Sequence, residues 1–152
     1  MKIVEFLRPD AVLASLSGQT APSVLAELCR PLAAAHHVDG QRLLDTLLER
    51  EKLGSTGIGE GVAIPHGKIA GLPGLLASFG RHPQGVDFRA IDGKPTFLFF
   101  ALFAPENSAG AHLKALARIS RIFKNPSFRD AILKAASADE VYRLIEVEDA
   151  KY

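Results

Sequence analysis

His66 is the residue of this sequence best suited to covalent chemistry, and it stands between a proline and a glycine in a glycine-rich segment. Because imidazole has an ordinary pKa of about 6.5, a neutral ring nitrogen is available near neutral pH to act as a nucleophile. Pro65 restricts the backbone before the ring and Gly67 allows a sharp turn after it, so the ring can face solvent at the end of a short strand. The other ring nitrogen would then need a carbonyl group to hold the tautomer. Residue types alone leave a turn or packing role for His66 open, and that is the commoner role of a lone histidine after a proline.

The segment from Arg50 to Lys68 is dense in glycine, since five of the chain's 13 glycines fall within it. Glycine costs backbone entropy, so this density indicates special dihedral angles or a close approach of the main chain to another group. Successive exposed N–H groups in such a loop can bind an anion. Known nucleotide motifs do not fit: the last two glycines enclose one residue more than a Walker loop does, and the earlier ones have the wrong spacing for a dinucleotide fingerprint.

Arg50 is a candidate anion ligand at the end of a predicted helix. Leu43, Leu47 and Arg50 follow one another at spacings of four and three residues, so Arg50 extends one edge of the buried face. A guanidinium fork there could bind a phosphoryl group through two parallel hydrogen bonds. The alternative is a cation that interacts only with the negative end of the helix dipole.

His112 is a second candidate histidine, in the first turn of another predicted helix. Free N–H groups and the positive end of the helix dipole favour an anion at that place. The same residue heads an apolar stripe formed with Leu116, Ile119 and Phe123. A buried histidine with satisfied hydrogen bonds and a purely structural role is therefore the alternative.

Other polar side chains lie near these candidates or match no motif. Ser55 and Thr56 could donate hydroxyl groups to an anion or could cap the loop, and Lys68 is expected to be a charge at the rim. Surface or helix-end positions are expected for the remaining histidines, His36, His37 and His82. A basic stripe with helical spacing indicates a solvated helix face, or else a docking surface for an acidic partner. The stripe consists of Lys114, Arg118, Arg121 and Lys124.

Two helices are predicted to open the chain and to place Arg50. The first covers residues 22–35, and Pro31 should kink or shorten it. The second covers residues 40–52 behind an Asp39 N-cap, and Gly54 ends it. Its buried stripe is formed by Leu43, Leu44, Leu47 and Leu48.

Extended segments are predicted for the middle of the chain, at residues 62–64, 75–81, 86–90 and 96–104. An Asp92-Gly93 turn separates the last two. The segment 96–104 is apolar at nearly every position, so a central strand covered on both faces is expected.

Three helices are predicted for the last third, at residues 109–124 after a Ser108 cap, at residues 128–135, and from a Ser137 capping box to about Glu146. Asn125-Pro126 should stop the first of them. This order predicts an α/β fold, a single layered domain over residues 1–152 with a small mixed β-sheet flanked by helices.

The composition is that of a globular protein, with 47% apolar and 23% charged residues. A formal net charge of +1 gives no global field to recruit nucleic acid or a membrane. Charged residues interrupt the first apolar run, which excludes a signal peptide, and the longest run, residues 97–105, is too short to span a bilayer. Cys29, the only cysteine, is expected in the core. We therefore expect a cytoplasmic protein without a metal site or a cofactor.

The segment Gly54-Ser-Thr-Gly-Ile-Gly-Glu-Gly-Val-Ala-Ile-Pro-His66-Gly-Lys68 closely resembles the active-site signature of the enzyme IIA proteins of the bacterial phosphoenolpyruvate-dependent phosphotransferase system. It is most similar to the nitrogen-regulatory branch, which is related to the mannitol and fructose IIA domains. The resemblance covers nearly the whole chain, including the Ala90-Ile-Asp-Gly93 turn and the His112-Leu pair at the start of a helix. It implies a mannitol-type IIA fold.

By this resemblance, His66 is the phosphoacceptor, and Arg50 and His112 stabilise the phosphoryl group without carrying it. The implied function is that of a histidine phosphocarrier, a phosphoryl-transfer component with no small-molecule turnover of its own. An HPr-like protein would be the donor, and partner proteins such as potassium-transport or sensor-kinase components would be regulated. Two alternatives stay open: a sugar-specific IIA component that passes phosphate to a separate IIB protein, and a module that binds an anion without reacting. The sequence does not specify an oligomeric state.

Overall fold

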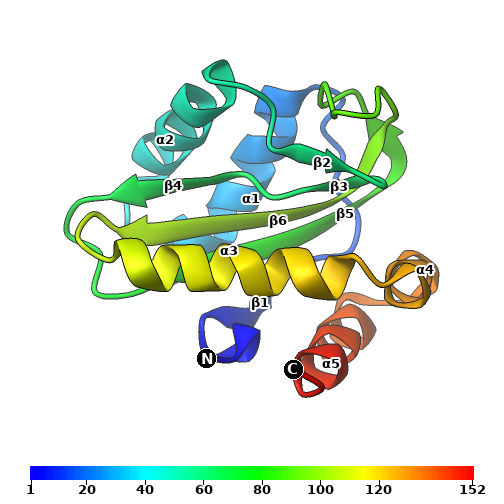
Figure 1. The fold of residues 1–152 in the computed structure, drawn as a ribbon. Coiled ribbons are helices and arrows are strands. Elements are labelled where there is room, and N and C mark those ends of the chain that lie inside the picture. The colour runs from blue at the N-terminus through cyan, green and yellow to red at the C-terminus, as the bar shows by residue number, and fades with distance from the viewer.

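The computed structural model describes residues 1–152, which form one mixed sheet of six strands with helices on both faces (Figure 1). The predicted layered α/β architecture is thereby confirmed. In chain order the elements are η1 (Ile3–Glu5), β1 (Leu7–Leu13), α1 (Ala21–His36), α2 (Gly40–Lys52), β2 (Gly57–Gly59), β3 (Val62–Ala63), β4 (His66–Ile69), β5 (Leu76–Val86), β6 (Thr96–Pro105), α3 (Ala109–Phe123), α4 (Pro126–Lys134) and α5 (Ala138–Asp149).

Strand β6 lies at the centre of the sheet, whose order is β1-β5-β6-β3-β2. It pairs antiparallel with β5 on one side. On its other side it pairs in parallel first with β3 and then with β4, where His66 is the partner of Leu102. Nearly every residue of β6 is buried, so the predicted central strand covered on both faces is confirmed.

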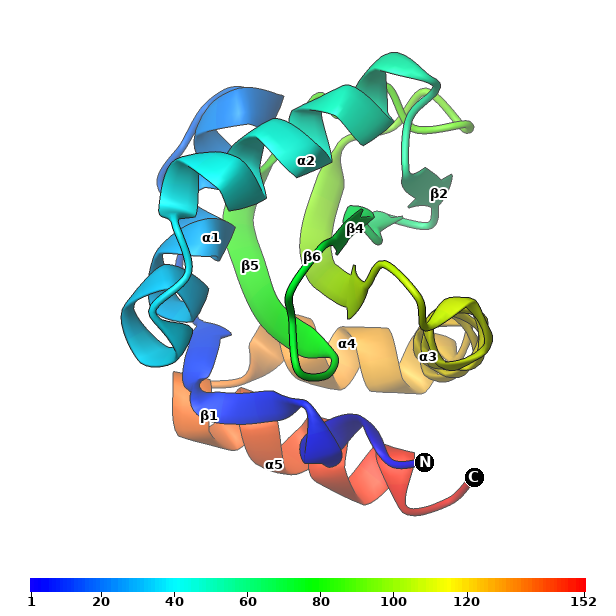
Figure 2. The same cartoon turned by 90° about the vertical axis from the view of Figure 1, so that its left-hand side faces the viewer.

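Helices α1 and α2 cover one face of the sheet, and α3, α4 and α5 lie on the other (Figures 1 and 2). A continuous apolar core joins the two layers. At its centre the ring of Phe123, from α3, stacks on that of Phe79 and meets that of Phe100 edge to face. No helix is long and apolar enough to cross a lipid bilayer.

The two predicted opening helices exist, and Pro31 does not shorten the first, which was one of the two effects expected of it. Helix α1 runs through Pro31 to His36 behind a Thr20 N-cap. Buried residues on both sides of the proline, Leu28 and Leu32, hold the helix against the core, so tertiary packing outweighs the missing main-chain hydrogen bond. Helix α2 has the predicted bounds, and the Asp39 side chain accepts a hydrogen bond from the Gln41 N–H group.

A helix was predicted to open the chain, and this is wrong, because η1 and strand β1 precede α1. Strand β1 pairs in parallel with β5 at the edge of the sheet. Residues 8–10 are all exposed, so the strand lacks the alternation of apolar and polar residues that would reveal it in the sequence. The extended piece predicted at residues 86–90 is a strand only at Val86, whereas the Asp92-Gly93 turn is confirmed by a hydrogen bond of 2.9 Å from the Gly93 N–H group to the Ala90 carbonyl.

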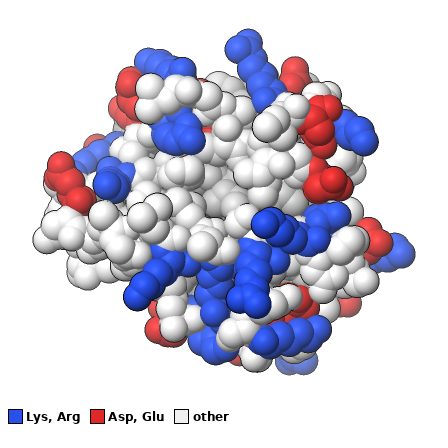
Figure 3. All heavy atoms as spheres, viewed as in Figure 1, with Lys and Arg blue, Asp and Glu red and all other residues white.

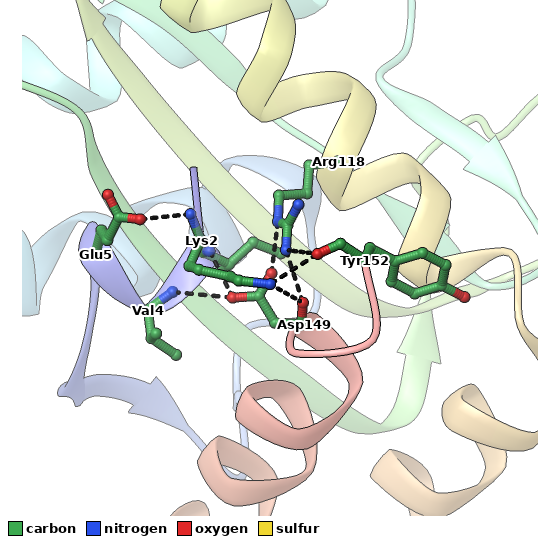
Figure 4. A network of polar contacts seen from close by, with 7 residues as sticks. Lys2, Val4, Glu5, Arg118, Asp149 and Tyr152 are labelled. Carbon is green, nitrogen blue, oxygen red and sulfur yellow. Dashed lines mark hydrogen bonds and ion pairs between the residues drawn. The ribbon is translucent and has the colours of Figure 1, made fainter.

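Helix α5 extends beyond its predicted end and finishes at Asp149. Asp149 is buried, with 1% of its surface exposed. Its carboxylate accepts hydrogen bonds of 2.6 Å from the main chain of Ile3 and from Nε of Arg118 on α3 (Figure 4). Lys2 and Arg118 also donate to the main-chain oxygens of Asp149 and Tyr152. The network ties the first residues of the chain, α3 and α5 together.

The basic stripe of α3 is therefore not the uniformly solvated face that was expected. Arg118 forms the buried ion pair with Asp149, and the Arg121 guanidinium lies 4.5 Å from the centre of the Tyr152 ring. Lys114, Arg121 and Lys124 are exposed and have no ion-pair partner.

Candidate active site

His66 is the first residue of β4 and is half-buried. Its Nδ1 atom lies 2.7 Å from the carbonyl oxygen of Ile64. With a proton on Nδ1, the ring donates to this carbonyl, and the lone pair of Nε2 is left available. The carbonyl expected to hold the tautomer is thus supplied two residues upstream, across Pro65, which lies between β3 and β4.

The pKa of His66 is lowered from its ordinary value, chiefly because burial disfavours the charged ring. The positive charge of Arg50 lowers this pKa further, while the hydrogen bond to Ile64 and the negative charge of Glu51 act in the opposite direction. The balance favours a neutral ring at neutral pH, which is the form that can attack an electrophile.

His112 lies in the first turn of α3, with 6% of its surface exposed. Its ring centre is 5.5 Å from that of His66, and the two rings meet edge to face at 73°. Burial, then the charges of His66 and Lys68, lower the pKa of His112 as well. Its Nε2 atom is buried and has no hydrogen-bond partner. The alternative, a buried histidine with satisfied hydrogen bonds, is therefore not what the structure contains. Leaving a buried polar atom unpaired costs about 1–3 kcal/mol of stability.

Arg50 lies in the last turn of α2, half-buried, and is close enough for its charge to act on His66. Helix α2 packs across β4, and this contact brings the end of the helix to the start of the strand. One guanidinium nitrogen, Nη1, donates to the Gly54 carbonyl at 2.8 Å. The remaining N–H groups of the fork have no hydrogen-bond partner within the protein.

The glycine-rich loop between α2 and β3 satisfies most of its polar groups internally. Ser55 donates to the Phe88 carbonyl at 2.6 Å and accepts from the Gly57 N–H group. Thr56 is bonded through its N–H and hydroxyl groups to the Glu51 carboxylate. The Glu60 N–H group donates to Asp92. The two hydroxyls are thus used to cap the loop, and several of its N–H groups are not free for an anion.

The other predicted positions have mixed outcomes. Lys68 is exposed at the rim, and His36 and His37 lie at the end of α1, as expected. His82 was expected at the surface, and this is wrong: it is buried in β5 with Nε2 2.8 Å from the Gly18 carbonyl. Its Nδ1 accepts from the Gln84 and Gly85 N–H groups, so the ring replaces main-chain bonds lost at an irregularity of the strand.

The face around the start of β4 carries few charges. In Figure 3 its centre is white, whereas basic side chains form a band along α3. Four exposed apolar side chains lie near the candidate residues or in the glycine-rich loop, and they were not identified from the sequence. They are Leu53 after α2, Ile58 in β2, Ile91 in the turn beside it and Leu113 next to His112. A neutral, partly apolar surface of this kind suits contact with another protein.

Comparison with known proteins identifies related sequences along almost the full chain. Residues 5–147 match the family described as "Phosphoenolpyruvate-dependent sugar phosphotransferase system, EIIA 2". A nitrogen regulatory protein of Bradyrhizobium diazoefficiens is 35% identical over 150 residues, which cover 99% of this chain and 98% of the relative. The fructose-specific EIIABC component of Bacillus subtilis is also 35% identical over 150 residues, but the chain spans only 24% of that protein.

Solved structures show the same fold. The crystal structure of the nitrogen regulatory protein IIA-Ntr from Neisseria meningitidis superposes with a TM-score of 0.89 at 35% identity, covering 94% of this chain and 98% of the other. The mannitol IIA protein of Escherichia coli superposes with a TM-score of 0.77 at 21% identity, covering 91% and 97%. The predicted mannitol-type fold is therefore confirmed.

Proposed function

The chain belongs to the EIIA 2 family of the phosphoenolpyruvate-dependent sugar phosphotransferase system, and within this family we propose that it is a histidine phosphocarrier that accepts a phosphoryl group on Nε2 of His66. The observation that carries the proposal is the pair formed by His66 and His112. One ring is anchored through Nδ1 to a carbonyl, and the other, 5.5 Å away, has a buried Nε2 without a partner.

The proposed step is an in-line displacement at phosphorus. The lone pair of His66 Nε2 attacks, the bond from phosphorus to the donor breaks, and its electron pair stays on the donor. The transferred group adds between one and two negative charges, so the site must provide charge stabilisation more than a base. The free N–H groups of Arg50 supply positive charge, and neutral His112 with its proton on Nε2 donates a hydrogen bond.

The proposed donor is an HPr-like phosphocarrier, and the proposed output is regulation of partner proteins, such as potassium-transport or sensor-kinase components. Full-length similarity to a nitrogen regulatory protein supports this output. A dianionic phosphoryl group would change the formal net charge from +1 to about −1, on a face whose centre is otherwise neutral. Such a change is large enough to alter which proteins bind there.

The test is phosphorylation from phosphoenolpyruvate through enzyme I and an HPr-like donor, followed by intact mass spectrometry at alkaline pH. We expect one acid-labile phosphoryl group on the wild type and none on His66→Ala. His112→Ala should still accept phosphate, more slowly. Label that persists in His66→Ala would reject His66 as the acceptor, and label found only on residue 112 would reverse the two roles.

A second candidate is a sugar-specific IIA component, which the 35% identity to the fructose-specific protein favours. This function requires onward transfer to a separate IIB protein. Incubation of the phosphorylated chain with purified IIB proteins distinguishes the two: loss of label to a IIB protein within seconds indicates sugar transport, and retention of the label indicates regulation.

A further inference from the structure

Glu51 follows Arg50 in the last turn of α2, and its half-buried carboxylate takes part in no ion pair. Instead both of its oxygens are directed to Thr56. Oε2 accepts from the Thr56 N–H group at 3.2 Å, and Oε1 accepts from the Thr56 hydroxyl. Thr56 is 4% exposed, so the carboxylate holds a residue that solvent scarcely reaches.

Thr56 is in turn connected to His66 through a single residue, Ile64. The carbonyl of Thr56 accepts a hydrogen bond of 3.0 Å from the N–H group of Ile64. The carbonyl of Ile64 is the group that lies 2.7 Å from Nδ1 of His66. A displacement of Thr56 would therefore tilt the Ile64 residue and move the oxygen that orients the imidazole.

We propose that Glu51 is a positioning residue for His66: by holding Thr56, it fixes the Ile64 carbonyl that keeps the proton on Nδ1 and leaves Nε2 free to react. The inference rests on the proposed function for its kinetic consequence, although its effect on the ring does not depend on phosphorylation. Arg50 holds the other end of the same loop segment through the Gly54 carbonyl, so two neighbouring residues of α2 fasten the loop with side chains of opposite charge.

A carboxylate suits this position better than an amide does. It accepts charge-assisted hydrogen bonds from an N–H and an O–H group at once. A glutamine could accept from the N–H group and donate to the hydroxyl oxygen, but both bonds would then be neutral and weaker. The negative charge of Glu51 also raises the pKa of His66 against the effect of Arg50. Glu51 thereby keeps the nucleophile more basic than it would be beside the arginine alone.

Two kinds of substitution separate position from charge. Glu51→Gln weakens the bonds to Thr56 and removes the charge. Thr56→Val removes only the hydroxyl donor, and Thr56→Ser retains it. Glu49→Gln is the matched control, because Glu49 lies on the same helix, is exposed and pairs only with Lys52.

The ring of His66 is observed through ¹⁵N–¹H correlation spectra across a pH titration, and phosphoryl acceptance is followed in a rapid-quench assay. In Glu51→Gln and Thr56→Val we expect a mixture of His66 tautomers and acceptance slowed by up to about 100-fold, the range of a misplaced reacting group. Glu51→Gln should also lower the pKa of His66. Thr56→Ser and Glu49→Gln should match the wild type in tautomer and rate.

A folded Glu51→Gln protein with a single Nδ1–H tautomer and an unchanged rate would overturn the inference. Equal behaviour of Thr56→Ser and Thr56→Val would overturn it too, and this pair decides the matter if Glu51→Gln does not fold. If the wild type accepts no phosphate, the proposed function fails, while the ring spectra still decide whether Glu51 positions His66.

Discussion

Thr46 of α2 and Gly67 of β4 approach so closely that no side chain fits at residue 67. A Cβ atom built on Gly67 would overlap Cγ2 of Thr46. Helix α2 can therefore lie directly against the strand that begins at His66, and Arg50, one helical turn beyond Thr46, is close enough for its charge to act on the histidine.

Gly67→Ala should separate α2 from β4, lower the free energy of unfolding by about 1–3 kcal/mol and slow phosphorylation of His66. Thr46→Ser removes Cγ2 and keeps the hydroxyl. In the double variant Thr46→Ser/Gly67→Ala it should restore most of the free energy of unfolding that Gly67→Ala alone loses. Urea unfolding of the four proteins measures the coupling. Gly110→Ala is the control, since a Cβ atom there meets open space and should be neutral or slightly stabilising. Additive effects of the first two substitutions would argue against this close contact.

Arg50→Lys should slow phosphoryl acceptance by about 100-fold, because an ammonium group keeps the charge but loses the planar fork. A lysine interacts with the end of a helix dipole as well as an arginine does, so an unchanged rate would favour the dipole role instead. Arg42→Lys, on the same helix and bonded to the Ala70 carbonyl at 2.8 Å, should leave the rate unaltered in the same single-turnover assay.

The pKa values of His66 and His112 are both lowered in the folded protein, so acid should destabilise the fold through these two residues. Above about pH 6.5 both states are deprotonated and the effect is absent. As the pH falls below that value, the unfolded chain takes up protons that the folded chain resists, and the free energy of unfolding declines until the folded pKa values are reached. Urea unfolding between about pH 7.5 and 5, the range over which histidine titrates, measures this free energy. It should decline less steeply in the double variant His66→Gln/His112→Gln than in the wild type. Identical pH dependence of the wild type and the double variant would contradict the lowered pKa values.

Asp149→Ala should cost about 3–5 kcal/mol of the free energy of unfolding, because it leaves the largely buried Arg118 charge and the Ile3 N–H group without their partner. Asp10→Ala breaks an ion pair with Arg8 whose side chains are both more than half exposed, at 57% and 55%, and should change stability by no more than about 1 kcal/mol. Denaturant midpoints report both effects. A loss at Asp149 no larger than at Asp10 would show that the network contributes little.

Sequence patterns predicted most elements because their signals are local. Asp39 caps α2, Leu43 and Leu47 mark its buried face, and the apolar run of β6 indicates a strand covered on both sides. Strand β1 gave no such signal, since Arg8, Pro9 and Asp10 are all exposed and its pairing with β5 is between distant segments.

The candidate site could be predicted only in part for the same reason. His66, Arg50 and His112 stand in recognisable places, and the resemblance of the glycine-rich segment singles them out. The contact of Glu51 with Thr56 depends on the path of the loop, and the burial of Asp149 depends on Arg118 from another helix. A His-Pro-Gln-Gly sequence at residues 82–85 could have revealed the irregularity in β5, because proline and glycine inside a strand mark such places.

Strand β4 is an edge strand: it pairs with β6 alone, and its outer side has no strand partner. An open edge invites pairing with other chains and so promotes aggregation. Here the edge is only four residues long, it follows Pro65, which has no N–H group to donate, and it carries the exposed charge of Lys68. The histidine can thus remain accessible to other proteins on a sheet edge that is a poor template for the growth of aggregates.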